Sequence, residues 1–152
     1  MTDLIAGHTP LANAAITIAS AGDIAMLVLW EGDAPDLAGL TALTYEPNRW
    51  WLIGAGGEAR ARIAAAIAGR GSVTPVGGGF ACATLAGPGW REVLMHEGLF
   101  DAESPTFRVG DCAATVIAHV PVWIHAAADD LARVWFPVSY VGAMAHVWGL
   151  EE

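Results

Sequence analysis

The chain contains no lysine, and its seven basic residues are all arginine. The formal net charge is −9, and residues 1–48 carry six acidic side chains without a single base. A chain of this charge repels phosphate backbones, and it lacks the basic patch that holds proteins on anionic membranes. The composition therefore argues against nucleic acids and membrane surfaces as partners.

Cysteine is nearly absent. Cys82 and Cys112 stand thirty residues apart, and no Cys-x-x-Cys pair or cluster with metal-ligand spacing accompanies them. His119 and His125 are six apart and would share one face of an unbroken strand, with Cys112 nearby, but no further ligand is evident. The first ten residues have neither a positive nor an apolar region of a signal peptide. We therefore expect reduced thiols, no metal site and a cytoplasmic location.

No apolar run is long enough for a membrane-spanning helix. The charge-free apolar stretch at the C-terminal end, Trp135–Leu150, has sixteen residues and includes Pro137, Ser139 and His146. A spanning helix needs about 20 predominantly apolar residues. The apolar character of the chain therefore requires another explanation.

Apolar residues and tryptophan are what the chain has in excess. It is 55% hydrophobic and only 15% charged, against about 25% charged residues in a typical domain. This composition excludes a disordered chain. Seven tryptophans are many for 152 residues, and Trp50 and Trp51 would point to opposite faces of a strand. Because tryptophan is enriched at interface hot spots, we expect a surface covered by another protein chain.

The pattern of apolar residues and turn formers predicts an α+β fold. We expect one domain over residues 1–152, with a mixed, largely antiparallel sheet and helices packed on one face. Strands are expected at 14–20, 24–30, 50–53, 80–86 and 131–138 and as a pair within 112–125. Helices are expected at 32–43, 58–68, 87–96 and 139–150.

Candidate chemistry is sparse. Gly54–Ala59 reads G-x-G-x-x-A between a strand and a helix, the shape of a dinucleotide-binding turn. The acidic residue that should follow about 20 positions later is absent, because no Asp or Glu occurs between Glu58 and Glu92. None of the possible nucleophiles stands beside an evident base: Ser104, Ser139, Cys82 and Cys112. We therefore assign no catalytic, cofactor-binding or metal-binding residue.

Several segments together carry a family resemblance: His8–Ala12, Arg49–Gly54, Leu85–Leu94, Asp101–Phe107 with Gly110, His119–Ile124, and Phe136–Tyr140 with Trp148 and Leu150. They resemble the sarcosine oxidase gamma subunits, whose strand-to-helix turn "L-x-G-P-x-A-x-x-V-L" is shared with the folate-binding domain of aminomethyltransferases. Pro137 and Val138 precede Ser139 where a basic residue often stands, so no anion contact is carried over.

The resemblance implies a non-catalytic small subunit that stabilises large flavoprotein subunits in a heterotetramer. Such a complex oxidises sarcosine or a related secondary amine. FAD, FMN, NAD and tetrahydrofolate are implied in the partner subunits, and none in this chain. The alternative is a stand-alone folate- or dinucleotide-binding enzyme of the aminomethyltransferase type.

The segment from Ser139 to Leu150 is the region where we expect a partner. His146 is its only side chain that can carry a charge, so a helix here has no polar face. A helix that is apolar all round must be covered all round, and a sheet within the domain covers one side only. We therefore expect contacts with the partner at Trp123, Met144 and Trp148.

Overall fold

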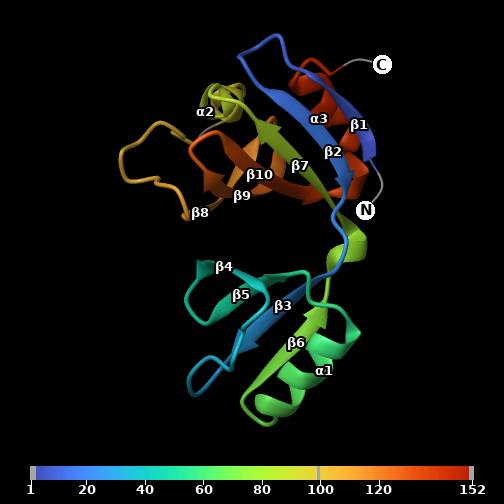
Figure 1. Ribbon diagram of the computed structural model, residues 1–152, viewed down its shortest axis with the longest axis vertical. Helices are drawn as coiled ribbons and strands as arrows, with labels where there is room; N and C mark the ends of the chain where they lie inside the picture. Colours follow the sequence, from blue (N-terminus) through green and yellow to red (C-terminus); the bar gives the residue numbers. More distant parts are fainter. Residues whose placement is uncertain (1–2, 99, 151–152) are drawn as a thin grey trace. The chain divides into compact units, whose positions relative to one another are not determined.

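The computed structural model describes residues 3–98 and 100–150, and the chain forms two compact units (Figure 1). Unit 1 combines the N-terminal segment through Ser20 with the segment that starts at Gly79. Unit 2 is the continuous segment Ala21–Gly78 between them. The middle of the chain is therefore inserted into a unit built from its two ends.

Unit 1 has a six-stranded antiparallel sheet with the order β1-β2-β7-β10-β9-β8. Two short helices and a 3₁₀ turn, η2, complete it. The elements are β1 (Asp3–His8), β2 (Ala15–Ser20), β7 (Phe80–Ala86), α2 (Trp90–Met95), β8 (Cys112–Ile117), β9 (Val120–Ala128), β10 (Leu131–Pro137), η2 (Val138–Tyr140) and α3 (Val141–Val147).

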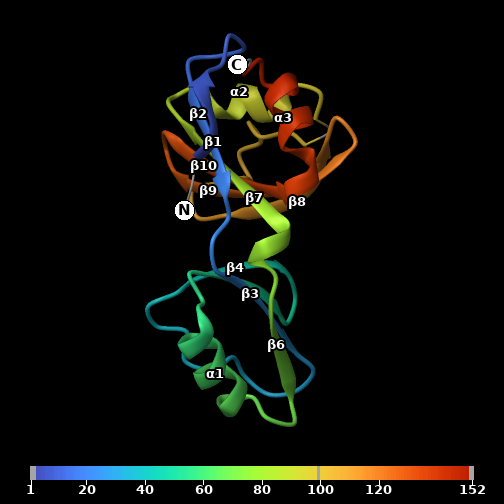
Figure 2. The ribbon, with the colours of Figure 1, turned by 90° about the vertical axis from the view of Figure 1, so that its right-hand side faces the viewer.

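The core of unit 1 lies between this sheet and its two helices. Successive strand residues point to opposite faces, so alternate residues such as Ile16 and Ile18 of β2 reach the same side. They form one buried cluster with Phe136 of β10, Trp90 of α2 and Trp148 after α3. Figure 2 shows both helices on the same side of the sheet.

Unit 2 repeats this plan on a smaller scale, with a four-stranded antiparallel sheet in the order β4-β5-β3-β6. Its second buried cluster joins Leu27 and Leu52 of the sheet to Ile63 of α1 and to Ile67. The elements are β3 (Ile24–Leu29), β4 (Thr41–Glu46), β5 (Arg49–Ile53), α1 (Gly57–Ala66), β6 (Gly71–Pro75) and the 3₁₀ turn η1 (Gly77–Gly79).

The α+β class is confirmed, and the helices of unit 1 lie on one face of its sheet as expected. The single mixed sheet is corrected to two sheets whose described strand pairs are all antiparallel. One domain over residues 1–152 stays a prediction. No helix within the described ranges is long and apolar enough to cross a membrane.

The expected helix at 32–43 is wrong. Residues 31–40 form a loop, and β4 begins at Thr41. The spacing of the leucines imitates a helix, but Leu37 and Leu40 pack as loop residues against the core of unit 2, while Leu43 lies in β4. The expected closing helix is also shorter, because α3 covers only Val141–Val147.

Candidate functional site

The two predicted partner contacts near the C-terminus lie inside unit 1. Met144 and Trp148 are both 0% exposed, and the Trp148 ring meets Phe136 edge to face at 6.2 Å. Thr9 hydrogen-bonds to the carbonyl oxygen of Trp148, and Pro10 packs close to Gly149. The N-terminal segment of the chain therefore covers part of this region, which we expected to need a partner chain.

Trp123 is the third predicted contact and keeps exposed surface. It lies on β9 and is half-buried. Its ring meets Phe80 edge to face, with 5.4 Å between centroids. Met144 and Trp148 have no exposed atoms. Trp123 alone of the three has exposed surface for a partner, and its contact stays a prediction.

A row of polar side chains crosses unit 1 over three neighbouring strands. Cys112 of β8 stands opposite His125 of β9, and His125 stands opposite Arg133 of β10. Burial lowers the pKa of His125, and the positive charge of Arg133 lowers it further. The Nδ1 atom of His125 is buried and has no hydrogen-bond partner among the described residues. This histidine is therefore held toward its neutral form.

This row does not form a metal site. His119 precedes β9 in a turn with φ +68°, so it does not continue the strand that carries His125. Within residues 3–98 and 100–150, no three His, Cys, Asp or Glu side chains gather closely enough to hold a metal ion. Neither Cys82 nor Cys112 is in a disulfide. Burial raises the pKa of Cys82 to about 11, so its thiol stays protonated at neutral pH and is a poor nucleophile.

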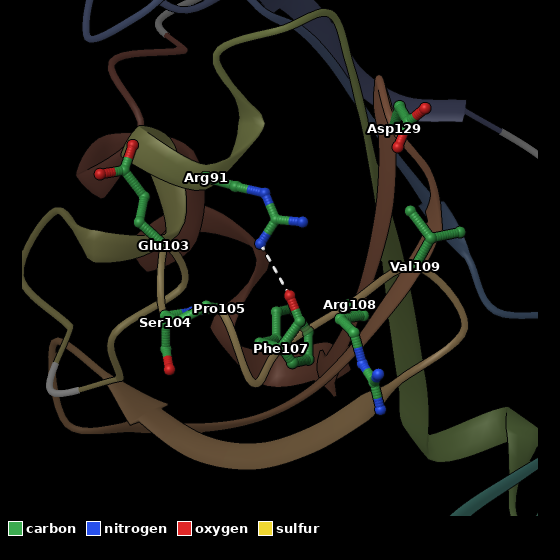
Figure 3. Close-up of a pocket in the computed structure, with 8 residues that line it drawn as sticks. All are labelled: Arg91, Glu103, Ser104, Pro105, Phe107, Arg108, Val109 and Asp129. Carbon is green, nitrogen blue, oxygen red and sulfur yellow. Dashed lines mark hydrogen bonds between the residues drawn. The ribbon is translucent and has the colours of Figure 1, made fainter.

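A pocket of about 380 Å³ lies beside the loop that follows α2 in unit 1 (Figure 3). The guanidinium of Arg91 donates hydrogen bonds to the carbonyl oxygens of Ala102 and Phe107 and stacks on the Trp90 ring at 4.3 Å. Arg91 therefore ties this loop to α2. The Ser104 hydroxyl lies 2.8 Å from that of Thr106, not beside a base. The described lining thus offers no activated nucleophile.

A second pocket, of about 430 Å³, lies at the start of α1 and includes the glycine-rich turn. The strands beside it are antiparallel, whereas dinucleotide sites lie at the carboxyl ends of parallel strands. The Asp23 carboxylate would stand 3.3 Å from a Cβ at Gly56, and Glu58 lies in the first turn of the helix. Arg62 also lines the pocket, but its guanidinium donates to the carbonyl oxygen of Asp36. The two carboxylates at this helix start repel a pyrophosphate.

Trp30 is the surface residue that the sequence did not single out. It is 64% exposed, while the other six tryptophans are buried or half-buried. It follows β3 directly and precedes the turn Glu31-Gly32-Asp33. A tryptophan next to an acidic turn was a usable signal, because such a turn lies on the surface.

The glycines of the Leu85–Leu94 motif have a structural explanation. A Cβ at Gly87 would lie 2.5 Å from the carbonyl oxygen of Asn13, and one at Gly89 would lie 2.8 Å from Ala12 Cβ. The turn from β7 to α2 therefore packs directly against the segment before β2. This close approach requires glycine whether or not a ligand binds.

Comparisons with known proteins agree with the sequence resemblance. One solved structure with the same fold is the heterotetrameric sarcosine oxidase from Corynebacterium sp. U-96 in complex with pyrrole 2-carboxylate. The TM-score is 0.79 at 14% identity, over 93% of this chain and 85% of that chain. No curated protein sequence matches. Residues 13–148 match the family described as "Sarcosine oxidase, gamma subunit family". The chain therefore belongs to the sarcosine oxidase gamma subunit family.

Proposed function

We propose that this chain is the non-catalytic gamma subunit of a heteromeric, flavin-dependent sarcosine oxidase or a related secondary-amine oxidase or dehydrogenase. In this role it stabilises the catalytic subunits. The observation that carries the proposal is membership of the gamma subunit family over residues 13–148. The fold shared with a chain of a heterotetrameric sarcosine oxidase supports it.

The chemistry of the described side chains supports a structural role. Catalysis by a cysteine needs a thiolate beside a base, but burial keeps the Cys82 thiol protonated. The guanidinium of Arg91, in the pocket beside α2, donates to two backbone carbonyl groups and so holds the loop after α2. In our proposal, FAD, FMN, NAD and tetrahydrofolate therefore bind to the large flavoprotein subunits and not to this chain.

We also propose that the complex works in the cytoplasm. The support is the cysteine usage, because neither Cys82 nor Cys112 is in a disulfide and Cys82 is buried within unit 1. Proteins of oxidising compartments use their cysteines in disulfides far more often.

Co-expression with the large subunits tests the proposed function. We expect the chain to co-purify with them in a fixed stoichiometry, and we expect sarcosine oxidation only by preparations that contain the large subunits. Omitting the chain should lower the melting temperature or the yield of the large subunits. Oxidation of sarcosine by the isolated chain, or a wild-type chain that never joins the large subunits, would contradict the proposal.

The second candidate, a stand-alone folate- or dinucleotide-binding enzyme, rests on the turn from β7 to α2 and on the turn before α1. Titration of the isolated chain with tetrahydrofolate and with NAD separates the two functions. We expect no binding at micromolar concentration, because close backbone packing explains Gly87 and Gly89, and two carboxylates flank the start of α1. Saturable micromolar binding of either compound would favour the enzyme.

A further inference from the structure

Trp30 is the most exposed large apolar side chain among the described residues. It is 64% exposed, and the next, Val109, is 47% exposed. Tryptophan contributes a large rigid area to an interface at a low cost in conformational entropy, and it is enriched among hot spots. An exposed tryptophan in a chain with six buried or half-buried ones therefore marks a candidate anchor for a partner.

The backbone that presents Trp30 is held on both sides by its neighbours in unit 2. The N–H of Leu29 donates to the carbonyl oxygen of Asn48, and the N–H of Trp30 donates to that of Arg70, each at 3.0 Å. The anchor therefore stands at the end of a hydrogen-bonded strand. Its backbone needs no ordering when a partner binds, which favours affinity.

The turn after Trp30 is fixed by one arginine. The guanidinium of Arg70 donates to the carbonyl oxygens of Glu31 and Asp33, at 3.4 and 2.6 Å. Gly32 between them has φ +82°, and a Cβ there would stand 2.7 Å from a guanidinium nitrogen of Arg70. The positive φ favours glycine at this point of the turn. The backbone of the acidic residues on either side of it is held by Arg70.

The surface around Trp30 is acidic. Glu31, Asp33 and Asp36 are exposed, and Arg62 and Arg70 direct their guanidinium groups to backbone carbonyls of this loop. The arginines keep their charge in these hydrogen bonds, so three carboxylates and two guanidinium groups leave the loop with a net charge of −1. Among the side chains that the structure describes, the one ion pair joins Arg49 to Glu46, so these three carboxylates have no cationic partner. A surface with cations around an apolar pocket is complementary to Trp30 and these exposed carboxylates.

We propose that Trp30, together with the carboxylates of Glu31, Asp33 and Asp36, docks into an apolar pocket rimmed by arginine or lysine on a large subunit of the complex. This inference rests on the proposed function, and it assigns the surface with which the chain contacts a large subunit. A second copy of this chain is a poor occupant, because two chains with a net charge of −9 each repel one another.

The test measures binding of the purified chain to the co-purified large subunits. We expect Trp30→Ala to raise the Kd at least tenfold while the circular dichroism spectrum stays that of the wild type. The matched control is Val109→Ala, the next most exposed apolar residue, which should change the Kd less than twofold. A Kd of Trp30→Ala within twofold of wild type would overturn the inference.

Charge reversal tests the rim separately. The double variant Glu31→Lys with Asp33→Lys should associate more slowly than the wild type. Added salt should weaken binding of the wild type, and it should weaken binding of the double variant less. Glu103→Lys, an exposed acid of unit 1, is the control and should behave as wild type. Equal association rates for the wild type, the double variant and the control would overturn the proposed role of the carboxylates in docking.

The failures can be told apart. If the wild-type chain does not bind the large subunits at all, the proposed function fails and this inference falls with it. If the wild type binds and Trp30→Ala binds equally well, only the docking surface is wrong. A wild-type dimer that Trp30→Ala converts to a monomer on size exclusion would assign the surface to a second copy and overturn the proposed occupant.

Discussion

Thr9 donates its hydroxyl hydrogen to the carbonyl oxygen of Trp148, 2.6 Å away and 139 positions later in the chain. The Thr9 residue is 1% exposed, and its hydroxyl oxygen also accepts a hydrogen bond from the Leu11 N–H. One buried hydroxyl therefore connects the segment after β1 to the segment after α3. It closes unit 1 where the two ends of the chain meet.

Replacing Thr9 by valine should destabilise unit 1. The shape is kept, but the carbonyl of Trp148 and the N–H of Leu11 lose their partner in a buried place, which costs about 1–3 kcal/mol. Urea unfolding followed by circular dichroism measures the loss. Thr9→Ser keeps the hydroxyl and should lose less. Equal unfolding free energies for the valine variant and the wild type would show that the hydrogen bond contributes nothing.

Trp148→Ala should unfold the chain more readily and not merely weaken binding of a partner. Trp148 is 0% exposed, and truncating a buried tryptophan costs about 3–5 kcal/mol. Trp148→Phe should cost less, because it keeps an aromatic ring and removes an N–H that has no partner among the described residues. Trp30→Ala, at an exposed position, is the control and should stay within about 0.5 kcal/mol of wild type. An unchanged unfolding free energy for Trp148→Ala would contradict its core position.

The two thiols should react at different rates. Burial raises the pKa of Cys82 to about 11, so little thiolate is present at pH 8, whereas Cys112 is half-buried. Labelling with a thiol reagent under native, non-reducing conditions should modify Cys112 first. Cys82→Ser should keep the fast phase, and denatured wild type should yield two thiols. A fast phase that survives in Cys112→Ser would disprove the order.

Acid should weaken the folded state through His125. Its pKa in the folded chain lies below the ordinary 6.5, because burial and then the charge of Arg133 disfavour the imidazolium. Below pH 6.5 the unfolded chain takes up the proton first, so the unfolding free energy falls as pH falls toward the folded-state pKa, and the loss then levels off. Above pH 6.5 both states are neutral at this position, and it adds no pH dependence.

The variant His125→Gln isolates this effect. The difference in unfolding free energy between wild type and His125→Gln should change between pH 7 and pH 5, because the exposed His96, His119 and His146 are common to both proteins. A difference that stays constant over this range would show that His125 titrates alike in the folded and unfolded chains.

The expected single domain over residues 1–152 predicts one cooperative transition. A calorimetric scan of the wild-type chain should show one peak whose calorimetric and van't Hoff enthalpies agree. Two resolved transitions would assign the two units separate stabilities. Leu27→Ala in the core of unit 2 and Val134→Ala in that of unit 1 would then each shift a different peak.

Sequence patterns predicted the strands that carry alternating apolar residues or a continuous apolar run. Ile16 and Ile18 revealed β2, and the run from Leu131 to Val138 revealed β10. The polar strand β6 was not predicted, because Ser72, Thr74 and Pro75 give no apolar signal. Its backbone pairing with β3 defines it as a strand, and this pairing cannot be seen in its side chains.

The prediction of a partner site at the C-terminal end was made without knowledge of tertiary contacts, and it stays a prediction. The region from Ser139 to Leu150 is apolar on all sides, but a segment more than a hundred residues earlier covers part of it through Thr9 and Pro10. No periodicity within a helix reveals which distant segment covers it. The structural roles of Arg70 and Arg91 were not predicted for a similar reason. Both donate to backbone carbonyls, which every residue carries, so no residue type in the sequence marks their partners.

The pairing of β2 with β7 has a consequence for the order in which the chain can fold during synthesis. Ser20, the last residue of β2, stands opposite Ala81 of β7. Unit 2 is therefore inserted between two strands that are paired with each other in unit 1. All strands of unit 2 have emerged from the ribosome when residue 78 has emerged, and they are close in sequence. β7 pairs with β2 on one edge and with β10 on the other. Its second edge can be paired only after β10, which ends at Pro137, has been synthesised. Strand pairing in the inserted unit can therefore bring Ser20 and Ala81 together early and shorten the loop that unit 1 must close.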